Sequence, residues 1–292
     1  MIEYRRLGRT ELRVSIITIG GCAPGFASTL EEATKAFKEA ISLGLNVVDI
    51  APTYGKAEDR LGPLIKKYRD KLIITEKTKQ RTKKDAWIEL NKSLEKLGAK
   101  YFDVYQFHAV DTIEDLEKIF SRDGAIHAFI EAKEVGLIKN IGITSHNVQT
   151  ILKALEKFDF DTVMTPINAG NMIIPRPQND FRPLLKIAID RDIGVIAIKA
   201  IAKRRWSTSN KRYNTWYEPF DQQDDVDKAL WFALSQEPVA TYSMACDLKL
   251  WPLIIKAAQR FKRLDKKEQE DVIKCFAQKS AMPLFPEDLY SK

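Results

Sequence analysis

The amino-acid sequence predicts an α/β protein that folds as a closed (β/α)8 barrel, and three observations support this prediction. Eight short runs rich in β-branched residues alternate with longer segments whose apolar residues recur at helical spacing. Successive runs lie about thirty residues apart, which is the length of one strand–helix–strand unit. The chain has 292 residues, and α/β barrels commonly place about 250 residues around one core. An open doubly wound sheet fits less well, because it usually needs only about five or six strands.

The predicted elements follow one another in regular order. A short β-hairpin comes first, because Tyr4–Leu7 and Val14 flank the turn sequence Gly8-Arg9-Thr10, and we place it at the barrel floor. The predicted strands are Ile16–Gly20, Asn46–Ala51, Leu72–Lys77, Phe102–His108, Asn140–His146, Thr162–Asn168, Gly194–Ala200 and Ala240–Cys246. Helices are predicted over Leu30–Leu43, Lys83–Leu97 and Val148–Phe158, and glycine stop signals stand at Gly44, Gly98 and Gly136.

Two connections in this pattern are unusually long. Residues Ala169–Asn179 follow the sixth predicted strand, and residues Ile201–Gln223 follow the seventh. Long loops in a compact domain are usually functional, so both are candidates for the walls of a binding site. A charged helix is predicted beyond Lys262. No stretch has the composition of a linker, and we expect residues 1–292 to form a single barrel domain.

Composition and charge exclude several classes of protein. Hydrophobic residues make up 45% of the chain and charged residues 30%, which excludes fibrous, low-complexity and intrinsically disordered proteins. The net charge is +7, but both signs alternate along the chain without a basic tail, so we expect no nucleic-acid partner. The first residues lack the apolar core of a signal peptide, and no apolar run reaches the ~18 residues of a membrane span. We therefore expect a cytoplasmic protein without membrane contact, a monomer or a weak oligomer.

The cysteines predict neither a disulfide framework nor a metal centre. Cys22, Cys246 and Cys275 are odd in number and far apart, and none belongs to a CxxC pair or lies at ligand spacing from a histidine. Cys22 follows the first predicted strand near the barrel mouth, where a small packing role is favoured over a redox switch. We expect no metal site.

Four polar residues stand at or just after the ends of three adjacent predicted strands. Asp49 and Tyr54 belong to the second strand and the loop after it, Lys77 ends the third strand, and His108 ends the fourth. In a (β/α)8 barrel the active site lies at the carboxyl ends of the strands, so these side chains are predicted to meet at one mouth. Lys79, two residues beyond Lys77, points to the same side of an extended chain and is the alternative lysine.

Together these four side chains indicate reduction of a carbonyl group. A phenol with a pKa of about 10 is a poor proton donor at neutral pH, unless a cation such as Lys77 lowers that pKa. A buried ammonium needs a carboxylate partner, and Asp49 can supply it. His108 can donate a hydrogen bond to the carbonyl oxygen. None of these groups is a hydride source, so the chemistry requires a nicotinamide cofactor.

At this point the chain resembles the aldo-keto reductase family along nearly its whole length. The similarity rests on Glu3-Tyr-Arg-Arg-Leu-Gly-Arg-Thr10, Ser93-Leu-Glu-Lys-Leu-Gly98 followed by Tyr101-Phe-Asp-Val, and Gly136-Leu-Ile-Lys-Asn-Ile-Gly-Ile-Thr-Ser145. The resemblance implies Tyr54 as the general acid with Asp49, Lys77 and His108 as supporting residues. It also implies that Ser145 and His146 contact the nicotinamide carboxamide.

The departures from the family pattern cluster on the cofactor side. Met164 stands where many members carry a glutamine, which makes Asn168 the expected polar contact. Ile198 stands where many members have an aromatic residue that stacks on the nicotinamide, and Lys199, which follows it, is a candidate cofactor contact. After the eighth strand, Asp247 and Leu248 stand where basic residues clamp the 2′-phosphate in many members, and a carboxylate there would repel a phosphate.

The seventh-strand loop offers positive charge that can compensate for Asp247. It carries Lys203, Arg204, Arg205, Lys211 and Arg212, with no acidic residue between Ile201 and Asn214. Cations at the barrel mouth can bind a pyrophosphate, so Lys203 and Arg204 are candidate cofactor contacts, unless this is merely a solvated loop. The family pattern favours NADPH over NADH, and NADH stays open. Two functions remain: an NAD(P)H-dependent reductase of aldehydes or ketones, and a reductase-like barrel that acts as a binding or regulatory subunit.

Overall fold

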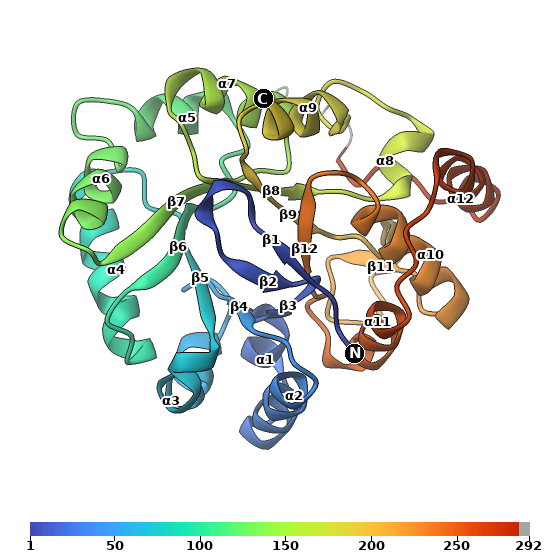
Figure 1. Cartoon of the computed structure of the whole chain (residues 1–292), viewed down its shortest axis with the longest axis horizontal. Coiled ribbons are helices and arrows are strands. Elements are labelled where there is room, and N and C mark those ends of the chain that lie inside the picture. The colour runs from blue at the N-terminus through green and yellow to red at the C-terminus, as the bar shows by residue number, and fades with distance from the viewer. Residues whose placement is uncertain (286–292) are drawn as a thin grey trace.

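The computed structural model describes residues 1–285, and its central feature is a closed barrel of eight strands (Figure 1). The barrel strands are β3 (Ile17–Gly20), β4 (Val47–Asp49), β5 (Ile73–Thr78), β6 (Phe102–Phe107), β7 (Ile138–Thr144), β8 (Thr162–Pro166), β9 (Gly194–Ile198) and β12 (Val239–Ser243). All neighbours are parallel, and β12 pairs with β3 to close the barrel. Each predicted strand overlaps one barrel strand, so the predicted (β/α)8 architecture is confirmed.

Helices surround the barrel as an outer ring (Figure 1). They are α1 (Cys22–Phe26), α2 (Leu30–Ser42), α3 (Ala57–Tyr68), α4 (Lys83–Leu97), α5 (Ile113–Ile119), α6 (Ile126–Glu134), α7 (Val148–Lys157), α8 (Ala169–Ile173), α9 (Arg182–Asp190), α10 (Gln223–Leu234), α11 (Trp251–Gln259) and α12 (Lys266–Gln278). Short 3-10 turns occur at Gly8–Thr10, Arg69–Lys71 and Leu248–Leu250. Among residues 1–285, no helix combines the length and the apolarity that crossing a membrane requires.

Local signals explain where the three predicted helices begin and end. The side chains of Thr29, Thr82 and Asn147 each accept a hydrogen bond from a backbone N–H in the first turn of the helix that follows. Helix α4 ends at Gly98, whose φ of 59° lies in the left-handed region that glycine adopts without a steric penalty. These caps set the bounds of α2, α4 and α7 within one residue of the predicted ones.

The amino-terminal hairpin closes the floor of the barrel, as predicted. Its strands β1 (Tyr4–Arg6) and β2 (Arg13–Ser15) pair antiparallel, and the turn donates a hydrogen bond from the Arg9 N–H to the Asp192 carbonyl at 2.7 Å. Leu7 and Val14 are fully buried against inward-facing strand residues, namely Val47, Val104, Met164, Ile196 and Ala240. The lower barrel is therefore packed with apolar side chains, which leaves the carboxyl ends of the strands for a site.

The two long connections contain regular structure that the sequence did not predict. Within residues 201–223, β10 (Ala202–Arg205) pairs antiparallel with β11 (Tyr217–Pro219), so part of the predicted loop is a two-stranded ribbon. The sequence Ala-Lys-Arg-Arg lacks the β-branched residues typical of strands, and backbone pairing with β11 forms the strand nevertheless. The connection after β8 contains the short helix α8. The predicted domain of residues 1–292 includes residues 286–292, which lie outside the described part.

Candidate functional site

A cleft of about 1090 Å³ opens at the carboxyl ends of the barrel strands. We call the part of the cleft lined by Asp49, Tyr54, Lys77, His108, His146 and Lys199 the inner end. The outer end is the part lined by the exposed cations Lys35, Lys211, Arg212 and Lys249, together with Tyr213 and Asp247. The four predicted catalytic residues thus lie together at the inner end.

Asp49 and Lys77 form a buried ion pair at the inner end. The Lys77 Nζ lies 2.5 Å from Asp49 Oδ1, and both side chains are almost completely buried. Asp49 also accepts hydrogen bonds from the hydroxyls of Thr75 at 2.8 Å and Ser243 at 2.9 Å, while Lys77 donates to the Ile50 carbonyl at 3.0 Å. Burial disfavours the ammonium, but the charge of Asp49 outweighs it and raises the pKa of Lys77. Lys77 therefore stays positively charged inside the barrel.

Tyr54 lies against this ion pair. The Lys77 Nζ is 4.9 Å from the centroid of the Tyr54 ring, and the rings of Tyr54 and His108 meet edge to face at 5.6 Å. Burial raises the pKa of the Tyr54 phenol above its ordinary value, although the charge of Lys77 acts in the opposite direction. The expectation that Lys77 favours the phenolate is supported, but burial has the larger effect in this state of the protein.

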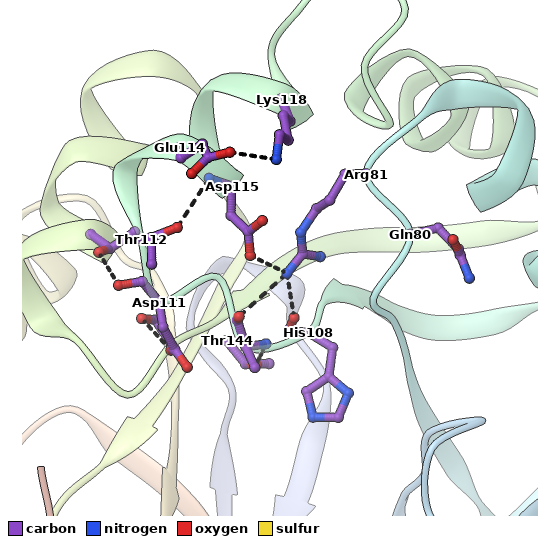
Figure 2. A network of polar contacts seen from close by, with 12 residues as sticks. Gln80, Arg81, His108, Asp111, Thr112, Glu114, Asp115, Lys118 and Thr144 are labelled. Carbon is purple, nitrogen blue, oxygen red and sulfur yellow. Dashed lines mark hydrogen bonds and ion pairs between the residues drawn. The ribbon is translucent and has the colours of Figure 1, made fainter. Parts of the chain in front are cut away.

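His108 faces the cleft as a neutral imidazole. Burial and nearby cations, with Lys77 first among them, hold its pKa well below the usual range. The Arg81 guanidinium donates a hydrogen bond to the His108 carbonyl at 2.8 Å and pairs with Asp115 at 3.2 Å (Figure 2). The ring of His108 points away from Arg81 in this view, so the backbone is anchored on one side while the ring stays available on the other (Figure 2). Its buried Nδ1 has no hydrogen-bond partner in the described part of the chain.

Lys79, the alternative lysine, also lines the cleft but is exposed. No carboxylate among residues 1–285 lies within ion-pair distance of its side chain. Both lysines line the cleft, but only Lys77 reaches Asp49. The geometry favours Lys77 as the cation next to Tyr54.

Ser145 and His146 follow β7, and both contact Asp111, which the sequence reasoning did not select. Asp111 Oδ1 accepts hydrogen bonds from the Ser145 hydroxyl at 3.1 Å and the His146 backbone N–H at 2.7 Å, and its Oδ2 lies 2.9 Å from His146 Nδ1. Burial raises the pKa of Asp111, but these hydrogen bonds outweigh burial and lower it to about 2. His146 lines the cleft, whereas the hydroxyl of Ser145 is engaged behind it.

Two further predicted cofactor contacts lie in different surroundings. Lys199 lines the cleft, and its Nζ is 3.1 Å from His146 Nε2. Asn168 is buried and does not line the cleft, because its side-chain oxygen accepts the Asn171 N–H at 3.0 Å and begins α8. Met164 and Ile198, the apolar residues at the altered family positions, both line the cleft.

The structure does not bring Lys203 and Arg204 to the cleft. Both side chains pair with Glu218, at 3.6 Å for Lys203 and 2.7 Å for Arg204. No acidic residue precedes Asn214 in this connection, but β11 returns antiparallel to β10 and brings Glu218 beside the two cations. The basic residues of the connection that do line the cleft are Lys211 and Arg212.

The cysteine prediction was wrong. Cys22, the first residue of α1, and Cys246, directly after β12, form a disulfide whose Cα atoms are 5.0 Å apart. The two cysteines are 224 residues apart in sequence, yet β3 and β12 are neighbours because the barrel closes. Both cysteines line the cleft. Cys275 is free.

Sequence signals for the missed residues existed but were weak. Asp111 lies three residues after His108 in the same loop, and an acidic residue near a predicted imidazole is a reasonable partner for another mouth residue. Cys22 and Cys246 each follow a terminal strand of a predicted closed barrel, and closure makes these strands adjacent. Glu218 offered no such signal, because only the unexpected ribbon brings it near Arg204.

The chain matches the model of the aldo/keto reductase family over residues 17–275. It is 30% identical over 216 residues to the uncharacterized oxidoreductase YqkF of Bacillus subtilis (69% of this chain, 66% of the relative). It is 27% identical over 221 residues to L-glyceraldehyde 3-phosphate reductase of Escherichia coli K12 (69% and 62%). The matched region thus spans about two thirds or less of these relatives.

Solved structures show the same fold. The holo form of aldo-keto reductase AKR11C1 from Bacillus halodurans superimposes with a TM-score of 0.75, at 21% identity, and the match covers 98% of this chain and 99% of that one. At this identity the likeness concerns the fold, while the family-model match covers most of the chain. With the barrel, the cleft and this match together, the chain belongs to the aldo/keto reductase family and is an oxidoreductase homologue.

Proposed function

We propose that this protein is an NAD(P)H-dependent reductase that converts an aldehyde or ketone to an alcohol, with Tyr54 as the general acid. One observation carries the proposal: Lys77 is held 2.5 Å from Asp49 and lies 4.9 Å from the Tyr54 ring centroid. A phenol, a fixed cation and a neutral imidazole thus converge at the inner end of one cleft. Membership of the family and the similarity to L-glyceraldehyde 3-phosphate reductase of Escherichia coli support this chemistry.

Each of the four residues has a distinct task. Tyr54 donates its proton to the carbonyl oxygen as that oxygen becomes an alcohol. Lys77 stabilises the phenolate that this transfer leaves behind, and Asp49 keeps Lys77 charged. His108, neutral because its pKa is lowered, donates a hydrogen bond that orients the carbonyl oxygen. The nicotinamide, when bound, supplies the hydride.

The cleft fits a dinucleotide in size and in charge. Its volume of about 1090 Å³ exceeds the range of roughly 300–1,000 Å³ that is usual for small-ligand pockets. At the outer end, Lys35, Lys211 and Lys249 are exposed cations that can bind phosphate groups. At the inner end, His146 offers a polar contact. Since Lys203, Arg204 and Asn168 do not line the cleft, we assign them no contact with the cofactor.

We further propose a preference for NADPH over NADH. Asp247 lines the outer end, but both of its oxygens already accept backbone hydrogen bonds, from Asn214 at 2.7 Å and from Lys249 at 2.8 Å. Its negative charge is therefore partly compensated, and the ammonium groups of Lys211 and Lys249 can attract a 2′-phosphate. The earlier candidates Lys203 and Arg204 are replaced in this role by Lys211 and Lys249.

The alternative, a binding or regulatory subunit, is not favoured. Such a role would not require Asp49, Lys77, Tyr54 and His108 to converge, and they do converge in the cleft. A decisive experiment measures oxidation of NADPH and of NADH with a panel of aldehydes and ketones, and cofactor binding by quenching of tryptophan fluorescence. Turnover of at least one carbonyl compound supports the reductase. Tight cofactor binding without turnover of any carbonyl compound would favour the regulatory role.

A further inference from the structure

A chain of three polar side chains runs along one wall of the cleft. Asp111 Oδ2 lies 2.9 Å from His146 Nδ1, and His146 Nε2 lies 3.1 Å from Lys199 Nζ. A second hydrogen bond, from the His146 N–H to Asp111 Oδ1 at 2.7 Å, fixes the backbone of His146 to the same carboxylate. The rings of Phe285 and Trp216 pack around the imidazole, at centroid distances of 4.7 and 6.2 Å. This Asp111–His146–Lys199 chain is separate from the Asp49–Lys77 pair.

The hydrogen bonds determine how the His146 ring is protonated. An ionised carboxylate only accepts hydrogen bonds, so the His146 Nδ1 bears the proton that faces Asp111. The Nε2 lone pair is then free to accept one N–H from Lys199. Burial and the charge of Lys199 lower the pKa of His146, which agrees with a neutral ring. Asp111 and His146 therefore orient the Lys199 ammonium without neutralising it.

Lys199 differs from Lys77 in what balances its charge. Lys77 is 2.5 Å from a carboxylate, whereas no carboxylate among residues 1–285 forms a direct ion pair with Lys199. The Lys199 Nζ lies 5.0 Å from the centroid of the Trp216 ring, a cation–π contact that leaves N–H groups available toward the cleft. Burial lowers the pKa of Lys199 to about 7. Lys199 is only partly buried, but a partly desolvated cation without a counter-ion is still less favourable than one whose charge a ligand balances.

The backbone holds Lys199 in this place at some cost in strain. Its φ is 58°, in the left-handed region that residues other than glycine rarely adopt. Hydrogen bonds on both sides maintain the conformation, from the Ile167 N–H to the Ile198 carbonyl at 3.2 Å and from the Ala202 N–H to the Lys199 carbonyl at 3.0 Å. Strain of this kind persists where surrounding structure enforces it, commonly at ligand sites.

We propose that Lys199 binds a carboxylate, or a similar anionic group, that the carbonyl substrate carries near its reacting carbonyl, with Asp111 and His146 as positioning residues. This inference rests on the proposed reductase function and narrows its substrate class to anionic aldehydes and ketones. Lys199 lines the same cleft as Tyr54 and His108, and its Nζ lies 3.1 Å from His146 Nε2. The phosphates of a cofactor have other cationic partners at the outer end, such as Lys211 and Lys249.

The test compares carboxylates with their methyl esters. The test measures reduction of three acids with NADPH and compares each acid with its own methyl ester. The acids are pyruvate, succinate semialdehyde and 4-carboxybenzaldehyde, which differ in the spacing between carbonyl and carboxylate. We expect the wild type to favour at least one acid over its ester. Lys199→Met should raise KM for that acid about 10- to 100-fold, the effect of a lost charge-assisted hydrogen bond, while the ester changes less than about threefold. Lys199→Arg should recover part of the loss, and Lys79→Met, which removes an exposed cation of the same cleft, is the matched control.

A pH profile of the wild type provides a second test that needs no variant. The groups acting on Lys199 are Asp111, Lys77, Asp49 and His146. Since the pKa of Lys199 is lowered to about 7, the Lys199 side chain carries its positive charge below that pH and loses it above that pH. KM for the acid should therefore rise as pH increases through about 7, while KM for the ester stays flat. Asp111→Asn should alter this profile, because the amide can no longer hold the His146 tautomer.

The outcomes separate this inference from the function on which it rests. If Lys199→Met raised KM equally for acids and esters, or left the preference for the acid unchanged, the assignment would be overturned. Equal weakening of NADPH and NADH binding without a change in acid preference would overturn it too, since the lysine would then serve the cofactor. If the wild type reduces neither acids nor esters, the proposed reductase function fails instead.

Discussion

At the inner end of the cleft, Asp49 and Lys77 form a buried ion pair, whereas the cations at the outer end are exposed. Asp49 accepts three hydrogen bonds, two from Lys77 and Thr75 of β5 and one from Ser243 of β12. Lys211 and Lys249 at the outer end are exposed. Charges in a low-dielectric interior act strongly on chemistry, while exposed charges are screened by water and salt. From this comparison we expect catalysis and cofactor preference to depend on different parts of one cleft.

The largest expected effect comes from breaking the buried ion pair. Lys77→Met removes the cation beside Tyr54 and leaves Asp49 buried without its counter-charge, so carbonyl reduction should be abolished. Loss of one partner of a buried pair also costs about 3–5 kcal/mol of stability, which urea denaturation can measure. The double variant Asp49→Asn/Lys77→Met should regain stability but not activity. Lys79→Met should be mild in both assays; the reverse result would transfer the role to Lys79.

The next effect concerns the proton donor. Tyr54→Phe keeps the ring and removes the hydroxyl, so kcat should fall by at least ~10²-fold while the dissociation constant of the cofactor stays nearly constant. Steady-state kinetics and fluorescence titration measure the two quantities. Tyr213→Phe is the matched control, because Tyr213 lines the outer end and its hydroxyl donates a hydrogen bond to the Asp221 carboxylate. Full turnover by Tyr54→Phe would refute the assignment of the general acid.

The outer end is probed through cofactor preference. Lys211→Ala/Lys249→Ala should raise the dissociation constant of NADPH about 3- to 10-fold more than that of NADH, because exposed charge contacts are weaker than buried ones. The difference should shrink at high salt. Lys203→Ala/Arg204→Ala is the control, since these cations pair with Glu218 away from the cleft. Equal weakening of both cofactors by the first variant would place the lysines on the pyrophosphate, and a larger effect of the control would restore the original assignment.

The disulfide should have the smallest effect on catalysis. It joins two segments that line the cleft, and Asp247, directly after Cys246, accepts the Asn214 N–H. Cys246→Ser should change kcat less than about twofold but lower the free energy of unfolding by about 2–4 kcal/mol, because the bridge closes a long loop. Cys275→Ser, at the free cysteine, should change neither. Thiol titration of the denatured wild type should find one thiol without reductant and all 3 cysteines with it; three thiols without reductant would contradict the disulfide.

Much of the inner end was predictable from the residues alone. Period-two alternation along a strand dictates which side chains share a face, so Lys77 and the neighbouring strand end at Asp49 were predicted to meet once the barrel was inferred. The direction in which the pKa of Tyr54 shifts was not predictable from the sequence, because burial outweighs the charge of Lys77 only in the packed cleft. Asp111 became visible as a partner of His146 only when β6 and β7 lay side by side.

The sequence by itself determined the barrel, the floor hairpin and the tetrad, because local periodicity and strand-end position are properties of short segments. Only the tertiary structure decided which contacts form between segments that are far apart in the sequence. Barrel closure joined Cys22 to Cys246, and the β10–β11 ribbon turned Lys203 and Arg204 toward Glu218. The order β7–β8–β9 in the barrel placed Lys199, which follows β9, next to His146, which follows β7. Such pairings depend on how the whole chain packs, which no local pattern of residues encodes.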